Sequence, residues 1–148
     1  MNNCSMKILL VEDDNDHAEL VIRSFNECDI PNEIIHAKDG EEALIFLNKK
    51  PVGSKTNLSF FPNLILLDLR LPKIDGINVL STIKNDNFLK QIPVVIFTTS
   101  NSPYDIEKSY FHHANSYLVK PNDYPNYQKL VNDLAHYWLE LNKNNNNL

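Results

Sequence analysis

The sequence has little of what several large protein classes need. Only two cysteines occur in 148 residues, Cys4 and Cys28, and they form neither a CxxC pair nor a zinc-type spacing with histidine. No apolar run approaches the ~18 residues of a membrane span, and the first residues lack the pattern of a secretory signal. We therefore expect a cytoplasmic protein with ordinary thiols and no membrane partner.

Basic charge is also scarce. The chain has 14 lysines and arginines against 19 aspartates and glutamates, which gives a net charge of −5. Because no short window is dominated by lysine and arginine, attraction to nucleic-acid phosphates is weak, and we expect no nucleic-acid partner. Neither GxGxxG nor GxxxxGK[ST] occurs, so the usual backbone cradles for nucleotides are missing.

Short apolar runs are what the sequence does contain. None of them alternates polar with apolar residues, which is typical of strands buried on both faces of a parallel sheet. Four are clear and a fifth, at 33–37, is weaker; the clear ones are Ile8–Val11, Leu64–Leu67, Val94–Phe97 and Tyr117–Val119. Segments with helical spacing lie between them, so the chain repeats a β-α unit five times. This order predicts an α/β fold with a doubly wound, five-stranded parallel sheet and helices on both faces.

One domain accounts for this pattern, with boundaries expected at residues 6–141 and tails at 1–5 and 142–148. Ser102 and Pro103, followed by an acid, predict a helix that starts there and runs to about His113. Helical spacing near the C-terminus continues to Leu141. The stretch 49–63 is too long for an ordinary connection and is interpreted as a surface loop whose two phenylalanines, Phe60 and Phe61, pack back onto the body.

Polar side chains follow four of the predicted strands. Glu12 and Asp13 follow the first, Asp68 the third, Thr98 the fourth and Lys120 the fifth. The carboxyl ends of parallel strands share one edge of a sheet, so these side chains are expected to meet there. Three clustered carboxylates repel one another unless a cation neutralises them, and Mg²⁺ suits such a site. Together they predict a phosphoryl-transfer site in which an aspartate is the nucleophile.

A phosphatase of the haloacid-dehalogenase type needs a second aspartate two residues after the nucleophile. This chain has Arg70 at that position, which argues against steady phosphatase turnover. His17 lies just beyond the acidic cluster and is expected on the surface of the first helix, where it could sense charge near the pocket. No histidine is well placed to act as a catalytic base.

The motifs in this order resemble a known family. ILLVEDD at 8–14, LLDLRLPKIDG at 66–76, PVVIFTTS at 93–100 and YLVKP at 117–121 are similar to the response-regulator receiver domain of two-component signalling. The resemblance covers about residues 6–141 and implies the flavodoxin-like receiver fold.

The resemblance implies roles for the acidic residues. Asp68 matches the aspartate that accepts a phosphoryl group from a phosphohistidine of a sensor histidine kinase. Asp13 matches the direct Mg²⁺ ligand, Glu12 the acid that holds a metal-bound water, and the backbone carbonyl of Arg70 the third protein ligand. The positions of Arg70 and Ser100 are ones that influence in this family how easily water attacks the aspartyl phosphate. Because Arg70 is long enough to cover the phosphoryl group, we expect Arg70→Ala to shorten its lifetime.

The resemblance also implies a switch. Thr98 matches the hydroxyl that hydrogen-bonds the phosphoryl oxygen, and Lys120 the ammonium that pairs with it. Tyr117 matches the aromatic residue that turns inward when Thr98 moves toward the phosphoryl group. The output face is then built from the Ser102–His113 helix, the fifth strand and the last helix, and it would dock a downstream protein target.

Three further features resemble the stand-alone regulators that accompany bacterial phytochromes: the long loop before the third strand, YLVKP at 117–121, and YWLEL at 137–141 at the end of the last helix. This resemblance implies a phytochrome-type kinase and a homodimer formed through the output face. Aromatic residues in the output-face elements make a dimer physically plausible. Phe111 and Trp138 have a second interpretation, in which they complete the core of the fold. A different class of function stays open as well, a constitutive binding module that keeps the fold without phosphorylation, although that module would be expected to lose one of the essential residues.

Overall fold

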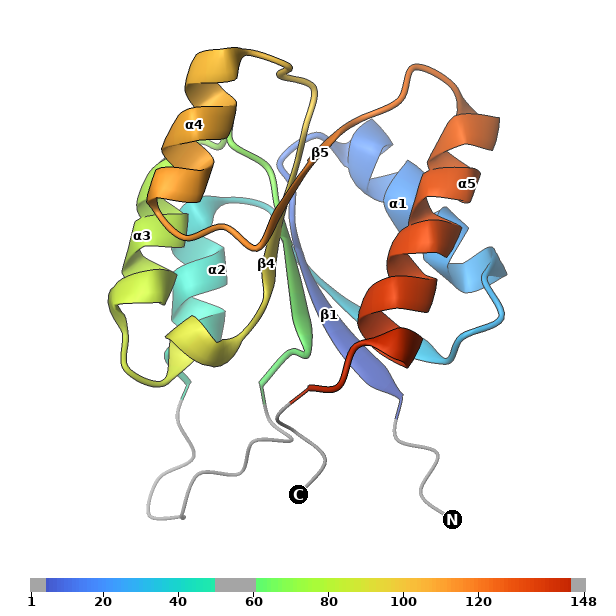
Figure 1. Cartoon of the computed structure of the whole chain (residues 1–148), viewed down its shortest axis with the longest axis horizontal. Helices are drawn as coiled ribbons and strands as arrows, with labels where there is room; N and C mark the ends of the chain where they lie inside the picture. The colour runs from blue at the N-terminus through green and yellow to red at the C-terminus, as the bar shows by residue number, and fades with distance from the viewer. Residues whose placement is uncertain (1–4, 50–60, 145–148) are drawn as a thin grey trace.

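A computed structural model describes residues 5–49 and 61–144 of the chain. Five parallel strands form one sheet in the order β2-β1-β3-β4-β5, which Figure 1 shows nearly edge-on between the helices. The strands are β1 (Met6–Val11), β2 (Asn32–Ala37), β3 (Leu64–Leu67), β4 (Val94–Thr98) and β5 (Ser116–Val119). The predicted five-stranded, doubly wound sheet is confirmed.

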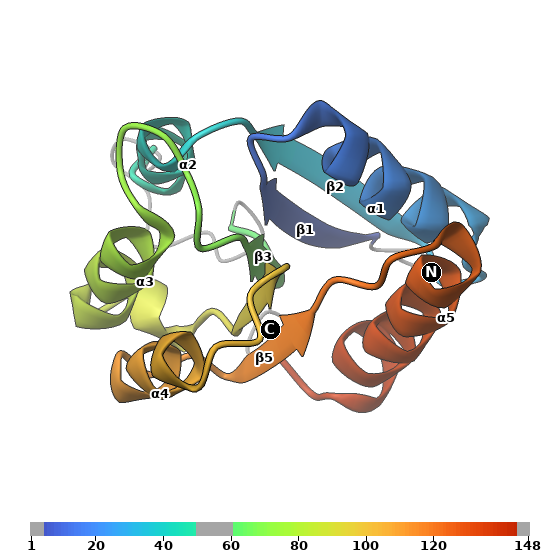
Figure 2. The same cartoon turned by 90° about the horizontal axis from the view of Figure 1, so that it is seen from above.

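Helices cover both faces of the sheet. Figure 2 shows α1 (Asn15–Glu27) and α5 (Tyr124–Ala135) on one face, and α2 (Gly40–Leu47), α3 (Gly76–Asn85) and α4 (Pro103–Phe111) on the other. A short 3₁₀ helix, η2 (Leu89–Gln91), precedes β4, and a π-helical segment, η3 (His136–Leu141), continues α5. Among the described residues no helix is long and apolar enough to cross a membrane.

Each buried strand contributes to two hydrophobic cores. In β1, Ile8 and Leu10 pack with α1 and α5, whereas Leu9 and Val11 pack with α2 and α3. The same division holds for β3 and β4. Because successive side chains of a strand point to opposite faces, a continuous apolar run is what a sheet covered on both sides requires.

The helix starts follow the capping residues. The Asp14 carboxylate accepts hydrogen bonds from the backbone N–H groups of Asp16 and His17, at 2.9 and 3.0 Å, and so fixes the start of α1 directly after the acidic motif. Ser102 caps α4 with Pro103 in its first turn, as predicted. That helix ends at Phe111, two residues before the predicted end, because His113 adopts a left-handed backbone with φ of 71°.

The last helix differs from the prediction. Regular α-helical spacing continues to Leu141 in the sequence, but the structure ends α5 at Ala135 and winds residues 136–141 as a π-helix. This wider turn leaves Leu141 58% exposed and buries Leu139 instead. Of the predicted loop at 49–63, Phe60 lies outside the described residues, while Phe61 packs on Phe88 with ring centroids 4.8 Å apart.

Lys84 forms hydrogen bonds at the edge of the sheet where the strands begin. The Lys84 ammonium donates to the carbonyls of Lys90 and Ile92, at 3.1 and 2.9 Å, and to Asn115 Oδ1 at 3.0 Å. The same Asn115 oxygen accepts the N–H of Val94 at 2.9 Å. Burial lowers the pKa of Lys84 to about 8. The end of α3 and the starts of β4 and β5 are therefore tied together, opposite the edge that carries the acidic residues.

Candidate functional site

The three predicted acids meet at the carboxyl edge of the sheet. β1 and β3 are adjacent and in register, and the Asp68 N–H donates to the carbonyl of Val11 at 3.1 Å. This pairing places the residues that follow the two strands side by side. Carboxylate oxygens of Glu12, Asp13 and Asp68 all lie within 4.8 Å of one another.

Lys120 is the positive centre of the site. β5 ends beside β4, and the Lys120 N–H donates to the Thr98 carbonyl at 2.7 Å. The side chain is only 1% exposed, and its ammonium donates to Asp68 Oδ2 at 2.8 Å and to Glu12 Oε1. Burial acts to lower the pKa of Lys120, but its hydrogen bonds and charge interactions with Asp68 and Glu12 outweigh burial and raise it. The lysine stays protonated and bridges the two acids.

One lysine does not neutralise the cluster of three acids, as the pKa of Glu12 indicates. Burial, followed by the negative charge of Asp68, raises the pKa of Glu12 to about 7 despite its contact with Lys120. A site with three carboxylates and one buried ammonium keeps surplus negative charge. Hard oxygen ligands at this spacing can hold a divalent cation, which would remove that surplus.

The Asp68 carboxylate is held at both oxygens. Oδ1 accepts the N–H of Leu69 at 2.7 Å and that of Arg70 at 3.4 Å, while Oδ2 accepts from Lys120. The residue keeps 7% of its surface exposed. A fixed orientation is what a nucleophile in phosphoryl transfer requires.

Thr98 and Tyr117 both contact the loop between β4 and α4. Thr98 is fully buried, and its Oγ1 accepts the N–H of Ser100 at 3.4 Å. The Tyr117 hydroxyl donates to the Ser100 carbonyl at 2.8 Å, and burial raises its pKa. Ser100 is therefore the point at which the predicted threonine and tyrosine are connected.

Two residues at the site were not among the predicted site residues. His17 was expected on the helix surface, but its Nδ1 lies 3.0 Å from the Lys120 ammonium and completes the set of three partners around that lysine. The signal was its place in the first turn of the helix that follows Glu12. Asp105 was recognised only as an early acid of α4, yet its Oδ2 accepts from Ser100 Oγ at 2.6 Å and from Arg70 Nη2 at 3.2 Å.

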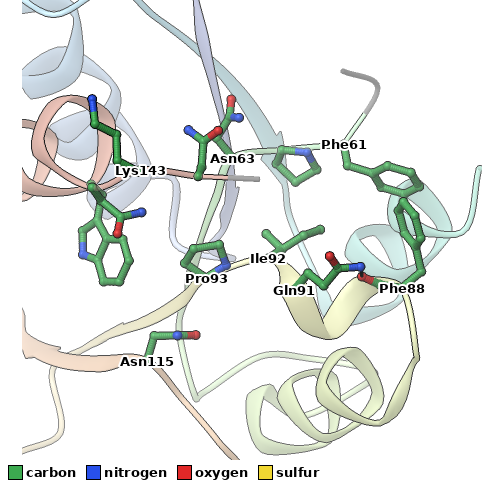
Figure 3. A pocket seen from close by; sticks show the side chains of 12 residues that line it. Phe61, Asn63, Phe88, Gln91, Ile92, Pro93, Asn115 and Lys143 are labelled. Carbon is green, nitrogen blue, oxygen red and sulfur yellow. Dashed lines mark hydrogen bonds between the residues drawn. The ribbon is translucent and has the colours of Figure 1, made fainter. Parts of the chain in front are cut away.

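A hollow of about 350 Å³ lies at the opposite edge of the sheet and is drawn in Figure 3. Residues that precede strands line it, including Asn63, Pro93 and Asn115, together with the aromatic rings of Phe88 and Trp138. None of its described lining residues is an acid. This hollow lacks the groups that phosphoryl or metal chemistry needs, so the carboxyl edge is the candidate site.

Comparison with known families decides the identity of the fold and the site. The family model described as the response regulator receiver domain matches residues 8–132. The chain belongs to this family. The resemblance stated from the sequence is confirmed, and the protein is a signalling switch of the kind that works with sensor histidine kinases.

Similar proteins extend over nearly the same length. FilR2 of Methanothrix harundinacea, described as a probable methanogenesis regulatory protein, is 43% identical over 136 residues, which cover 92% of this chain and 85% of that protein. Response regulator Rcp1 of Synechocystis is 44% identical over 133 residues, covering 90% and 88% of the two chains. The Mn²⁺-bound crystal structure of Rcp1 aligns at 40% identity with a TM-score of 0.82, over 94% of this chain and 98% of that chain.

A phosphorylated relative has the same fold. The crystal structure of the phosphorylated cyanobacterial phytochrome response regulator RcpA has a TM-score of 0.84 and 35% identity, and the alignment covers 95% of this chain and 99% of RcpA. These likenesses confirm the flavodoxin-like receiver fold.

Proposed function

We propose that this receiver domain accepts a phosphoryl group on Asp68 from a phosphohistidine of a sensor histidine kinase. The observation that carries the proposal is the Asp68 carboxylate itself, which is oriented by the Leu69 N–H and Lys120 and lies within 4.8 Å of the carboxylates of Glu12 and Asp13. In the transfer, an Asp68 oxygen forms a bond to phosphorus while the bond between phosphorus and the kinase imidazole breaks. The electron pair of that bond returns to the imidazole nitrogen.

Lys120 and Thr98 would stabilise the transferred group. The Lys120 ammonium already contacts the oxygen of Asp68 that lies toward β5, so it can pair with phosphoryl oxygens without a large movement. Thr98 ends the neighbouring strand and presents a hydroxyl at the same edge. These contacts would assist transfer to the protein itself, and we propose slow hydrolysis of the aspartyl phosphate by water as the return step.

The proposed cation is Mg²⁺. Asp13 and Asp68 would bind it directly, with the Arg70 carbonyl as the third protein ligand and Glu12 through a water molecule. The donor set is all oxygen, and three carboxylates within 4.8 Å of one another fit a divalent ion; burial and then the charge of Asp68 raise the pKa of Glu12, and a bound cation would oppose both effects. When bound, such an ion neutralises charge on phosphoryl oxygens.

Phosphorylation would act on the loop between β4 and α4. The phosphoryl group adds charge and strong acceptor oxygens, which attract Thr98 and Lys120. Thr98 Oγ1 and the Tyr117 hydroxyl both bind Ser100, so movement of the threonine changes the support of the tyrosine. We propose that this couples Asp68 to the output face of α4, β5 and α5, which would bind a downstream protein target.

The output face is also the proposed dimer interface. Phe111 is 77% exposed and Tyr104 66% exposed, so the interpretation of Phe111 as a core residue is wrong, whereas Trp138 is partly buried against the core. Exposed aromatic side chains on one helix are typical of interface cores. The likeness to Rcp1 and RcpA supports a phytochrome-type kinase as the partner. We also propose a cytoplasmic location, which suits a chain with only two cysteines.

Sedimentation tests the dimer. After incubation with acetyl phosphate and Mg²⁺, the wild-type protein is expected to shift toward the mass of a dimer, and Phe111→Ser is expected to sediment as a monomer at the same concentration. Ile45→Ser is the matched control, because Ile45 is 54% exposed on α2, away from this face. Equal sedimentation of wild type and Phe111→Ser in both states would contradict the proposed interface.

Mass spectrometry tests the phosphoryl acceptor. Incubation with acetyl phosphate and Mg²⁺ is expected to add the mass of one phosphoryl group to the wild-type protein, and Asp68→Asn is expected to gain none because an amide oxygen is a poor nucleophile. Asp75→Asn is the control, since Asp75 is an acid that caps α3 outside the cluster. A constitutive binding module would gain no mass in any variant, and a gain retained by Asp68→Asn would place the acceptor elsewhere.

A further inference from the structure

Asp105 holds two residues at the rim of the site. Its Oδ2 accepts the Ser100 hydroxyl at 2.6 Å and Arg70 Nη2 at 3.2 Å. The Asp105 side chain is 15% exposed, whereas that of Arg70 is 75% exposed. The contact joins the loop after β3 to the first turn of α4, which are 35 residues apart in the chain.

The backbone of each Asp105 partner lies beside a group that the proposed phosphorylation would involve. The backbone N–H of Arg70 lies 3.4 Å from Asp68 Oδ1, and that of Ser100 lies 3.4 Å from Thr98 Oγ1. Arg70 therefore has its backbone at the nucleophile but its guanidinium directed to α4. Two anionic groups can pair with the arginine side chain: the Asp105 carboxylate and a phosphoryl group on Asp68.

We propose that Asp105 is a positioning residue for dephosphorylation, which holds the Arg70 side chain on α4 and away from the aspartyl phosphate. The inference rests on the proposed phosphorylation of Asp68. In hydrolysis a water oxygen bonds to phosphorus, the bond between phosphorus and the Asp68 oxygen breaks, and inorganic phosphate and a proton leave with the carboxylate restored. A guanidinium over the phosphoryl group obstructs that water, so the carboxylate that retains Arg70 keeps the path open.

Electrostatics sets the size of the effect. The phosphoryl group carries more charge than Asp105, but Asp105 already contacts the guanidinium at 3.2 Å and is fixed by its hydrogen bond from Ser100. Ion pairs with one exposed partner are weak, so their loss changes an equilibrium by about two- to five-fold. The same factor is expected in the lifetime of the aspartyl phosphate.

Decay of the phosphorylated protein tests the proposal. After acetyl phosphate is removed, Asp105→Asn is expected to keep its phosphoryl group about two- to five-fold longer than wild type. Arg70→Ala is expected to lose it faster, and Asp105→Asn in the Arg70→Ala background is expected to decay at the rate of Arg70→Ala alone. Asp105→Glu, which keeps the charge, should decay within about two-fold of wild type. Asp105→Ser serves in place of the asparagine variant if that variant fails to fold.

Glu107→Gln is the matched control, because it removes one negative charge from the exposed side of the same helix and should leave the lifetime unchanged. A general loosening of α4 would lengthen or shorten the lifetime whether or not Arg70 is present, and that result would overturn the proposal, as would an unchanged or shorter lifetime in Asp105→Asn. If wild type takes up no phosphoryl group, the proposed function fails first and this inference falls with it.

Discussion

Lys120→Met is expected to destabilise the metal-free protein by about 3–5 kcal/mol at pH 8, which corresponds to a loss of roughly 6–20 °C in Tm for a chain of this size. Methionine retains the length and the apolar stem of lysine but removes the ammonium that bridges Glu12 and Asp68. Two buried carboxylates are then left without a counter-charge. Thermal unfolding in a chelating buffer measures the effect.

The loss of stability in Lys120→Met should be smaller at low pH. The sign of this pH dependence follows from the pKa of Glu12. Its pKa is about 7 in the folded protein and 4.5 in its ordinary state, so between these values the folded chain binds more protons than the unfolded chain. The contribution of this group to stability is therefore present below about pH 4.5 and is lost as pH rises through about 7. In Lys120→Met the lysine no longer opposes this shift, so the difference between pH 5 and pH 8 is larger than in wild type.

Divalent ions provide the matched control. Added Mg²⁺ should restore part of the stability of Lys120→Met at pH 8, because the ion would supply positive charge to the same carboxylates. Lys129→Met removes a lysine from α5, outside the acidic cluster, and is expected to change stability by less than about 0.5 kcal/mol. A variant at position 120 that is equally destabilised at pH 5 and pH 8, with or without Mg²⁺, would show that its lysine acts by packing alone.

The main features of the site could be predicted because they depend on topology. Once the apolar runs are recognised as strands of one parallel sheet, the residues after them must share an edge, whatever the details of packing. That reasoning brought Asp68 and Lys120 together although they are 52 residues apart, and the structure confirms their contact at 2.8 Å. The two-faced burial of the sheet followed from the same apolar runs.

Contacts made by long or exposed side chains could not be predicted. The partners of Arg70 depend on which rotamer reaches which carboxylate, and nothing in the local pattern distinguishes Asp105 from any other acid in a first helical turn. His17 has the same difficulty, because helical periodicity places it at the margin between solvent and the pocket. The π-helical turn at 136–141 is also invisible to a pattern of period 3.6, since the core selects Leu139 over Leu141 only through tertiary packing.

Gly76→Ala is expected to be strongly destabilising although Gly76 lies outside the acidic cluster. A Cβ at this position would lie 2.2 Å from the Asp68 carbonyl oxygen and 2.6 Å from the Leu69 Cα, and these are backbone atoms that cannot turn aside. The Gly76 N–H also donates to the Leu69 carbonyl at 3.0 Å, so α3 begins in direct contact with the loop that follows Asp68. We expect a loss of about 3 kcal/mol or more, measured by denaturant unfolding.

The position of this clash predicts a second effect, on phosphorylation. To accommodate the methyl group, the backbone at Asp68 and Leu69 must move away from α3, and the Leu69 N–H that orients Asp68 Oδ1 moves with it. Phosphorylation by acetyl phosphate should therefore be slower in the fraction that stays folded, because an error of about 1 Å at a reacting group can cost up to about 100-fold in rate. Thr82→Ala, on the exposed side of the same helix, should leave the rate unchanged. A Gly76→Ala protein with normal stability and normal phosphorylation would mean that the loop after β3 yields easily, contrary to its packing against α3.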